Sequence, residues 1–133
     1  MKRTLQLDTH VVVWLYAGEH DRFPDALRAR LNADDLRISP MVRIELTYLH
    51  EIGRINDTPD RIVGELATAV GLAEDAQSFS RVIEVAQRES FTRDPFDRII
   101  VAQALAAHDQ LATKDERILA AYPDNALWDK DRS

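Results

Sequence analysis

Segments with the pattern of short strands alternate with segments with the pattern of helices along this chain. Residues 4–7 alternate polar and apolar side chains, which predicts a strand, and the apolar run 11–16 after a polar break predicts a helix ending at Gly18. Further strands are predicted at 36–39, 111–113 and 126–128. Strands that alternate with helices form mostly parallel sheets covered on both faces, so the sequence predicts an α/β fold of this kind.

Proline after a capping residue marks several helix starts. Thr58-Pro59 and Asp94-Pro95 each place an N-cap residue before a proline, which suits the first helical position. Pro24 and Pro40 also open runs in which apolar residues recur at helical spacing. Helices are therefore predicted from 24, at 40–52, at 59–70, from 78 or 80, at 95–108 and around 118–119.

The length and composition suit one domain. The chain has 133 residues, 45% of them hydrophobic, so we expect a single domain over 1–133, with an ordered core of about 3–128 and a frayed C-terminal tail. It contains no cysteine, which excludes disulfides and thiolate metal sites and fits a reducing cytoplasm, the location we expect. No apolar run approaches the ~20 residues that span a bilayer, so we expect no membrane association.

The net charge of −6 limits how the chain could act on nucleic acid. Proteins that bind nucleic acid by general neutralisation of its phosphates are usually basic, which argues against simple coating of DNA. Acids gathered where cations bind would still permit metal-dependent chemistry. The four glycines are scattered and form no phosphate-binding loop, and the four histidines show no metal-ligand spacing, although His10 is close to Asp8.

Carboxylates at the edges of apolar runs are the candidate site residues, namely Asp8, Glu45, Asp97 and Asp115. Each also has a structural interpretation. Asp8 and Asp115 could cap the helices that follow them, and Glu45 could pair with Arg43 or Arg54 or be solvated. Asp97, at the third position of the helix that Asp94 caps, could stabilise the first turn, so this pair could be purely structural. Yet Asp94 suffices as the cap, which leaves Asp97 free to point elsewhere.

The positions of these acids favour a joint interpretation. Asp8 and Asp115 both follow predicted strands, so they share the carboxyl edge of a parallel sheet, where ligands bind in such folds. The helix that begins near Asp94 leads directly into the strand before Asp115. Carboxylates gathered there would repel one another without cations, and oxygen-only ligation suits Mg²⁺ or Mn²⁺.

Several short segments occur in an order that resembles a known family. They are Leu7-Asp8-Thr9-His10, Ile44-Glu45-Leu46, Gly53-Arg54-Ile55, Asp94-Pro95-Phe96-Asp97-Arg98 followed by Ala102-Gln103-Ala104, and Ala112-Thr113-Lys114-Asp115. From residue 5 to about 128 the chain resembles PIN-domain proteins of the VapC type, the ribonuclease toxins of bacterial and archaeal toxin–antitoxin pairs. The run from Asp94 to Arg98 is the most specific part. Many relatives carry His just before that run, where this chain has Arg93.

The resemblance implies a fold, an activity and partners. The fold would be a three-layer α/β/α sandwich with a mostly parallel sheet. The activity would be that of an endoribonuclease dependent on Mg²⁺, or on Mn²⁺ as a substitute, in which a metal-activated water hydrolyses RNA phosphodiesters. The protein would form a homodimer and would be inhibited by a small VapB-like antitoxin.

The resemblance also implies roles for individual residues. The metal ligands would be Asp8, Asp97, Asp115 and, directly or through water, Glu45. Thr9 and Thr113 would be supporting polar residues near the metal. Candidates for contact with the RNA backbone are Arg43, Arg93, Arg98 and Lys114, for each of which a surface ion pair is the alternative.

Two other functions remain open from the residues alone. A non-catalytic binding module would use its acids only as helix caps. A phosphohydrolase with Asp8 as nucleophile would resemble haloacid-dehalogenase-type enzymes at one point, but those enzymes need a second Asp two residues on, where this chain has His10. Thermal melting with and without Mn²⁺ distinguishes a metal site from a binding module.

Overall fold

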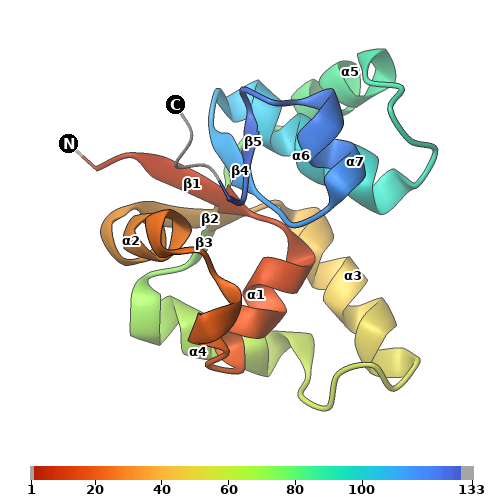
Figure 1. Ribbon diagram of the computed structural model, residues 1–133. Helices are drawn as coiled ribbons and strands as arrows, with labels where there is room; N and C mark the ends of the chain where they lie inside the picture. The colour runs from red at the N-terminus through yellow and green to blue at the C-terminus, as the bar shows by residue number, and fades with distance from the viewer. Residues whose placement is uncertain (1, 130–133) are drawn as a thin grey trace.

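A five-stranded parallel sheet forms the centre of the protein. The structure is a computed structural model that describes residues 2–129. Of the frayed tail predicted at 129–133, residues 130–133 lie outside the described residues. The sheet has the order β3-β2-β1-β4-β5 (Figure 1), and all four pairings are parallel. The strands are β1 (Thr4–Leu7), β2 (Asp35–Ile38), β3 (Ala73–Glu74), β4 (Gln110–Ala112) and β5 (Ala126–Leu127).

Helices cover both faces of the sheet. They are α1 (Thr9–Tyr16), α2 (Asp25–Ala33), α3 (Pro40–Glu51), α4 (Pro59–Val70), α5 (Phe79–Arg88), α6 (Pro95–Ala107) and α7 (Glu116–Ala121), with a 3₁₀ turn at His20–Arg22. Figure 1 shows α1, α2 and α4 on one side of the sheet and α5, α6 and α7 on the other, which confirms the expected α/β sandwich. In the part of the chain that the structure describes, no helix has the length and apolar character needed to cross a membrane.

The first strand lies in the middle of the sheet and is buried on both faces. Leu5 and Leu7 are fully buried, and Leu5 is in register with Leu36 of β2 and with Gln110 of β4. The polar side chain between them, Gln6, is also buried and donates to Asp109 at 3.1 Å. Burial on both faces is typical of a parallel sheet enclosed by helices, and it keeps the carboxyl end of β1 in a fixed position.

The caps predicted before Pro59 and Pro95 begin their helices as expected. The side chains of Thr58 and Asp94 accept hydrogen bonds from backbone amides in the first turns of α4 and α6. Ser39, which was predicted as the last residue of a strand, instead caps α3. Pro24 is the N-cap residue of α2 and lies just before its first turn. The helix α6 ends at His108, whose positive φ of 58° turns the chain out of the helix and into β4.

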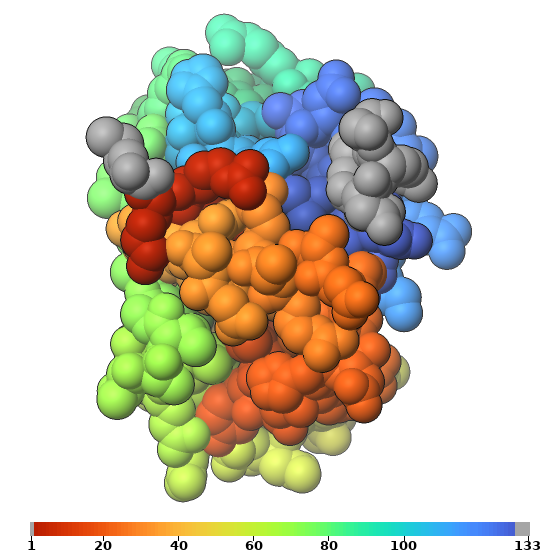
Figure 2. All heavy atoms as spheres, turned by 60° about the vertical axis from the view of Figure 1, so that its left-hand side comes forward, coloured from red at the N-terminus to blue at the C-terminus, as the bar shows by residue number. Residues whose placement is uncertain are grey.

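One strand was not predicted from the sequence. The strand β3 has only two residues, both exposed, and Ala73 pairs with Arg37 at the outer side of β2. A segment this short has no alternating pattern that could distinguish it from a loop. In the space-filling view of Figure 2, the N-terminal segment (red) and the last described strands and helix of the chain (blue) lie on the same face as α2 (orange).

Candidate functional site

The carboxyl edge of the sheet brings distant parts of the chain together. Asp8 directly follows β1, and its backbone amide donates to the carbonyl of Ala112, the last residue of β4, at 3.0 Å. Leu7 is in register with Ala112. Because β1 and β4 are parallel neighbours, Asp8 lies beside the segment Thr113 to Asp115 that follows β4.

The predicted carboxylates meet in one pocket at this edge. The pocket has a volume of about 370 Å³ and is lined by Asp8, His10, Trp14, Glu45, Asp94, Asp97 and Asp115. The structure therefore brings together the four acids proposed from the sequence, with Asp94 beside them. Among the described residues, no Lys or Arg lines this pocket, and His10 is the only basic side chain in its lining.

Asp8 is the most buried of these acids. It is 7% exposed, and burial raises the pKa of its carboxyl group. The Asp8 Oδ1 accepts from the amide of Thr9 at 2.7 Å, and Oδ2 accepts from the hydroxyl of Thr113 at 2.6 Å. These two donors act against the effect of burial on the pKa and fix the orientation of the carboxylate.

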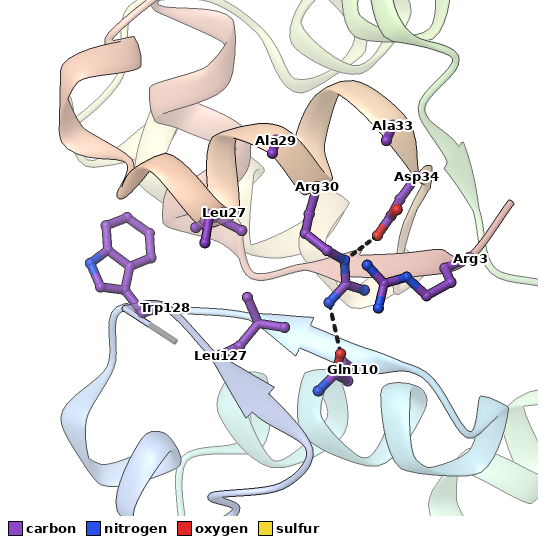
Figure 3. Close-up of a pocket in the computed structure, with 10 residues that line it drawn as sticks. Arg3, Leu27, Ala29, Arg30, Ala33, Asp34, Gln110, Leu127 and Trp128 are labelled. Atoms are coloured by element: carbon purple, nitrogen blue, oxygen red, sulfur yellow. Dashed lines mark hydrogen bonds and ion pairs between the residues drawn. The ribbon is translucent and has the colours of Figure 1, made fainter. Parts of the chain in front are cut away.

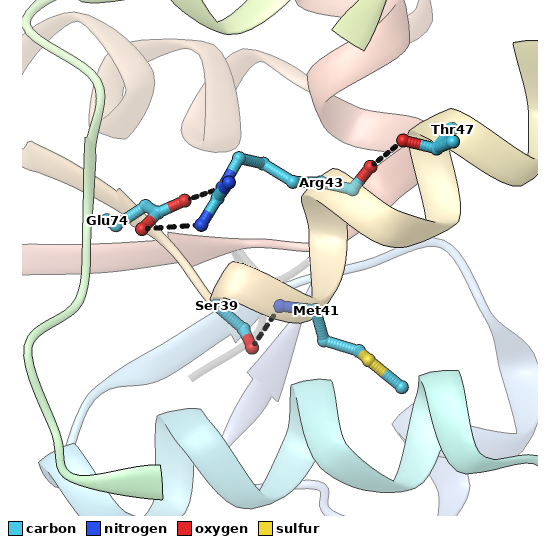
Figure 4. A network of polar contacts seen from close by, with 5 residues as sticks. All are labelled: Ser39, Met41, Arg43, Thr47 and Glu74. Carbon is cyan, nitrogen blue, oxygen red and sulfur yellow. Dashed lines mark hydrogen bonds and ion pairs between the residues drawn. The ribbon is translucent and has the colours of Figure 1, made fainter. Parts of the chain in front are cut away.

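Glu45 enters the pocket from α3. Its Oε1 accepts from the hydroxyl of Thr9 at 2.5 Å, so Thr9 joins α1 to α3 and does not cap its own helix. Burial is the main cause that raises the pKa of Glu45, and the charge of Asp8 adds to it. Neither Arg43 nor Arg54, the two arginines considered as partners of Glu45, pairs with it. Arg43 forms an ion pair with Glu74 (Figure 4). No ion pair of the described residues involves Arg54.

Asp94 and Asp97 have different surroundings although they are one helical turn apart. The Asp94 Oδ1 accepts from the amide of Phe96 at 2.9 Å, as the cap interpretation predicted. No hydrogen bond or ion pair among the described residues involves the side chain of Asp97. Burial, followed by the charges of Asp8, Asp94, Asp115 and Glu45, raises the pKa of Asp97 to about 7. Asp97 is therefore the carboxylate of the pocket whose charge is least compensated.

Asp115 has a structural bond and also faces the pocket. Its Oδ1 accepts from the amides of Arg117 and Ile118 at 2.8 and 3.1 Å and so caps α7. Its own amide donates to the hydroxyl oxygen of Thr113 at 3.1 Å. Thr113 thus connects Asp8 to Asp115. Asp115 therefore both caps α7 and lines the pocket, two roles that the sequence analysis treated as alternatives.

The four basic residues proposed to contact RNA differ in their surroundings. Arg98 donates from Nε to the carbonyl of Ala86 at 2.8 Å and from Nη2 to that of Gln87, so it caps the C-terminal end of α5. Arg43 is paired with Glu74 on the outer side of α3 (Figure 4), and Arg93 is exposed. The Lys114 ammonium lies over Trp14. Contact of these four residues with RNA stays a prediction.

Sequence reasoning missed one residue of the pocket, Trp14. Both His10 and Trp14 lie on α1, four residues apart, and so on the face of α1 that turns toward Asp8. Their ring centroids are 5.9 Å apart. The spacing 10 and 14 after a strand-end aspartate could have indicated this, because residues at i and i+4 share a helix face.

The chemistry of these side chains fits a divalent cation. Within residues 2–129, no group of three or more His, Asp or Glu side chains is already arranged to hold a metal ion. An ionised carboxylate has about four acceptor sites, so Asp8, Glu45 and Asp115 retain lone pairs beyond the bonds they accept. With Asp97 unpaired and its pKa raised to about 7 mainly by burial and neighbouring acids, a hard cation is the compensation that the pocket lacks.

A larger hollow than the acidic pocket lies elsewhere in the described part of the chain. It has a volume of about 540 Å³ and lies between α2 and the strands β4 and β5 (Figure 3). Its acid, Asp34, already accepts from Arg30 at 2.5 Å, and Arg30 also donates to Gln110 at 2.8 Å. The hollow contains no cluster of unpaired acids, so its size does not make it the site of the chemistry.

A parallel α/β sandwich with an acidic pocket at the carboxyl edge of its sheet defines the class of the protein. The PIN domain family model matches residues 6–124, and the chain belongs to this family, in its VapC type. Ribonuclease VapC22 of Mycobacterium tuberculosis is 32% identical over 120 residues, which cover 86% of this chain and 89% of the relative.

A solved structure supports the same fold. The crystal structure of VapBC2 from Rickettsia felis bound to a DNA fragment from their promoter is similar with a TM-score of 0.66. The match covers 95% of this chain and 99% of that chain, at 16% sequence identity. At this identity the likeness concerns the fold.

Proposed function

We propose that this protein is a metal-dependent endoribonuclease and the toxin of a toxin–antitoxin pair. The observation that carries the proposal is the meeting of Asp8, Glu45, Asp97 and Asp115 around one pocket that no Lys or Arg lines. The family and the relative named Ribonuclease VapC22 support the activity. Mg²⁺ is the proposed ion, with Mn²⁺ as a substitute, because all four proposed ligands are carboxylates.

The four acids and two threonines have separate roles in this proposal. Asp8, Asp97 and Asp115 would hold the cation, and Glu45 would hold it directly or through water. A bound divalent cation would offset charge on the scissile phosphate and lower the pKa of water for in-line attack, leaving 5′-phosphate and 3′-hydroxyl ends. Thr113 and the amide of Thr9 hold the carboxylate of Asp8 in one orientation. The hydroxyl of Thr9 does the same for Glu45.

The proposed partners follow from the same family. The fold neighbour from Rickettsia felis is a VapBC2 structure, which supports a small VapB-like antitoxin as the inhibitor of this chain. The expected homodimer stays a prediction. We place the protein in the cytoplasm, where its proposed RNA substrate is found.

The proposal is tested by RNA cleavage with protein purified free of antitoxin. Cleavage is expected with Mg²⁺ or Mn²⁺ and not with EDTA, and it should be lost in Asp97→Asn. Asp94→Asn is the matched control, because it changes an acid one turn away whose observed bond is that of a helix cap. Equal cleavage by wild type and Asp97→Asn, or cleavage unaffected by EDTA, would overturn the proposal.

The two alternative functions are not favoured. Asp8 is a poor candidate nucleophile, because both of its oxygens accept hydrogen bonds and the residue is 7% exposed. A binding module without a metal site should not be stabilised by Mn²⁺. The proposed site should be, since a ligand at 100 times its Kd raises the free energy of unfolding by about 2.7 kcal/mol. An unchanged melting temperature at millimolar Mn²⁺ would favour the binding module.

A further inference from the structure

We propose that Trp14, Lys114 and Arg22 form a nucleotide-binding platform beside the acidic pocket, on which an unpaired base of single-stranded RNA stacks. This inference rests on the proposed ribonuclease function and names where the substrate would be held. Trp14, Lys114 and Arg22 together make up the Trp14 platform.

Trp14 lies beside the acids of the pocket. Its partly buried indole lines the same pocket as Asp8, Asp97 and Asp115. A nucleotide stacked on this ring would therefore be a direct neighbour of the phosphate at the carboxylates. Among the described residues, Trp14 and His10 are the only aromatic side chains that line this pocket.

Two positively charged side chains, Arg22 and Lys114, lie next to the indole of Trp14. The Arg22 guanidinium carbon is 4.9 Å from the Trp14 ring centroid, and the Lys114 ammonium is 5.9 Å from the same centroid. Both side chains are exposed. The pocket itself is lined by acids and repels phosphates, whereas this side of it presents positive charge. A groove that combines cations for the backbone with an aromatic ring for the base is the usual arrangement for binding single strands.

Trp14 packs against a buried aromatic side chain, Trp128. Trp128, which is only 9% exposed, packs edge-to-face with Trp14 and also with Phe23, each at a centroid distance of 5.8 Å. The indole of Trp14 is thus supported from behind by a buried aromatic cluster. Such a supported ring loses little conformational entropy when a base stacks on it.

Arg22 can leave the ring without a large energetic cost. Its ion pair with Glu19, at 2.8 Å, is exposed on both sides. Exposed pairs of this kind contribute little to stability, so the guanidinium is free to move to a phosphate when a base occupies the indole.

The platform selects for single-stranded RNA. In an A-form duplex the base faces are stacked on one another, and only an unpaired nucleotide can place its face on an indole. Every base has such a face, so stacking on Trp14 itself adds little sequence preference. The contact therefore specifies the class of substrate, unpaired RNA, and leaves base recognition to other contacts.

Intrinsic fluorescence gives a direct test, because Trp14 and Trp128 are the only tryptophans in the chain. An unstructured RNA 12-mer is titrated into the full-length protein in EDTA, so that cleavage does not intervene, and binding is followed by tryptophan quenching and by anisotropy of labelled RNA. Wild type is expected to show quenching, and the same sequence in a duplex should not quench. Trp14→Leu should weaken binding about 5- to 160-fold, the range for loss of one base stack.

Matched variants separate stacking from a change in folding. Trp14→Phe keeps an aromatic face and should recover most of the binding. Phe79→Leu changes an aromatic that is 71% exposed on α5 and does not line the pocket, so its affinity for RNA should equal that of wild type. Lys114→Met should reduce the salt dependence of binding by about 0.7 in the slope of log K against log [salt].

The outcomes distinguish the platform from the nuclease. RNA that quenches Trp14 but is never cleaved with Mg²⁺ would support the platform and contradict the ribonuclease proposal. Cleavage in which Trp14→Leu has the KM and kcat of wild type would contradict the platform alone. Absence of RNA binding by wild type, or equal affinity of wild type and a folded Trp14→Leu, would overturn the platform.

Discussion

Thr113 donates its hydroxyl proton to Oδ2 of Asp8 at 2.6 Å, although the two residues are 105 positions apart in the sequence. The same hydroxyl oxygen accepts from the amide of Asp115 at 3.1 Å. A single buried side chain therefore sets the relative positions of two proposed metal ligands.

Replacement of Thr113 by valine should reduce cleavage about 10- to 100-fold, the usual cost of losing a residue that orients a metal ligand. It should also lower the free energy of unfolding by about 1–3 kcal/mol, because Asp8 keeps a buried oxygen without its donor. Cleavage assays and denaturant unfolding measure the two effects. Thr113→Ser keeps the hydroxyl and serves as the control, and a serine variant as impaired as the valine variant would contradict this role.

Asp97 should make the metal-free protein less stable as pH rises. Its folded pKa of about 7 is above the ordinary value of 3.8, so between these values the folded state holds a proton that the unfolded state has lost. The contribution of Asp97 to stability is therefore present at low pH and is lost as pH rises through 7.

The pH effect is measured by melting wild type and Asp97→Asn in EDTA from pH 4 to pH 8. Asparagine resembles the protonated acid, so the two melting temperatures should be close at pH 4 and should diverge in favour of Asp97→Asn at pH 8. A gain of 1 kcal/mol corresponds to roughly 4 °C for a chain of this size. A variant that is less stable than wild type at pH 8 would contradict the raised pKa.

Asp94 should behave as a helix cap and not as a ligand. Asp94→Ala removes the acceptor for the amide of Phe96 and should cost about 0.5–2 kcal/mol of unfolding free energy, whereas Asp94→Asn should cost little because asparagine caps equally well. Both variants should still cleave RNA. Loss of cleavage in a well-folded Asp94→Asn would mean that the two acids of this run have the opposite roles.

Arg98 should contribute to stability through α5. Arg98→Met removes the donors to the carbonyls of Ala86 and Gln87, and loss of hydrogen bonds from a charged group costs about 1.5–3 kcal/mol. Chemical denaturation measures this, and a raised KM for RNA in the folded variant would show that Arg98 also contacts the RNA backbone. Arg93→Met, an exposed neighbour, should change stability by less than about 0.5 kcal/mol and raise KM if Arg93 contacts the backbone.

Features determined by neighbouring residues were predictable from the sequence. Thr58-Pro59 and Asp94-Pro95 begin their helices because a cap and a proline act within one turn. The strand at 4–7 was predictable from its alternation, and its carboxyl end correctly located Asp8 at the sheet edge. The strand β3 was not, because two exposed residues contain no pattern.

Features determined by distant neighbours were not predictable from the residues alone. The bond from Thr9 to Glu45 depends on which faces of α1 and α3 meet, and the contact of Arg98 with α5 depends on how α5 packs against α6. The raised pKa of Asp97 combines burial with the charges of four other acids, and their separations exist only in the folded chain. The sequence therefore named the acids but not their charge state.

The sheet has outer strands of only two residues, β3 on one side and β5 on the other. Each side thus exposes few free backbone amides and carbonyls, which protects the protein from edge-to-edge aggregation. A peptide that added itself to this sheet as a further strand would gain only a few hydrogen bonds. We therefore expect proteins that bind this chain tightly to recognise its helices and side chains, and a search for inhibitors of the proposed nuclease should favour helical ligands over extended peptides.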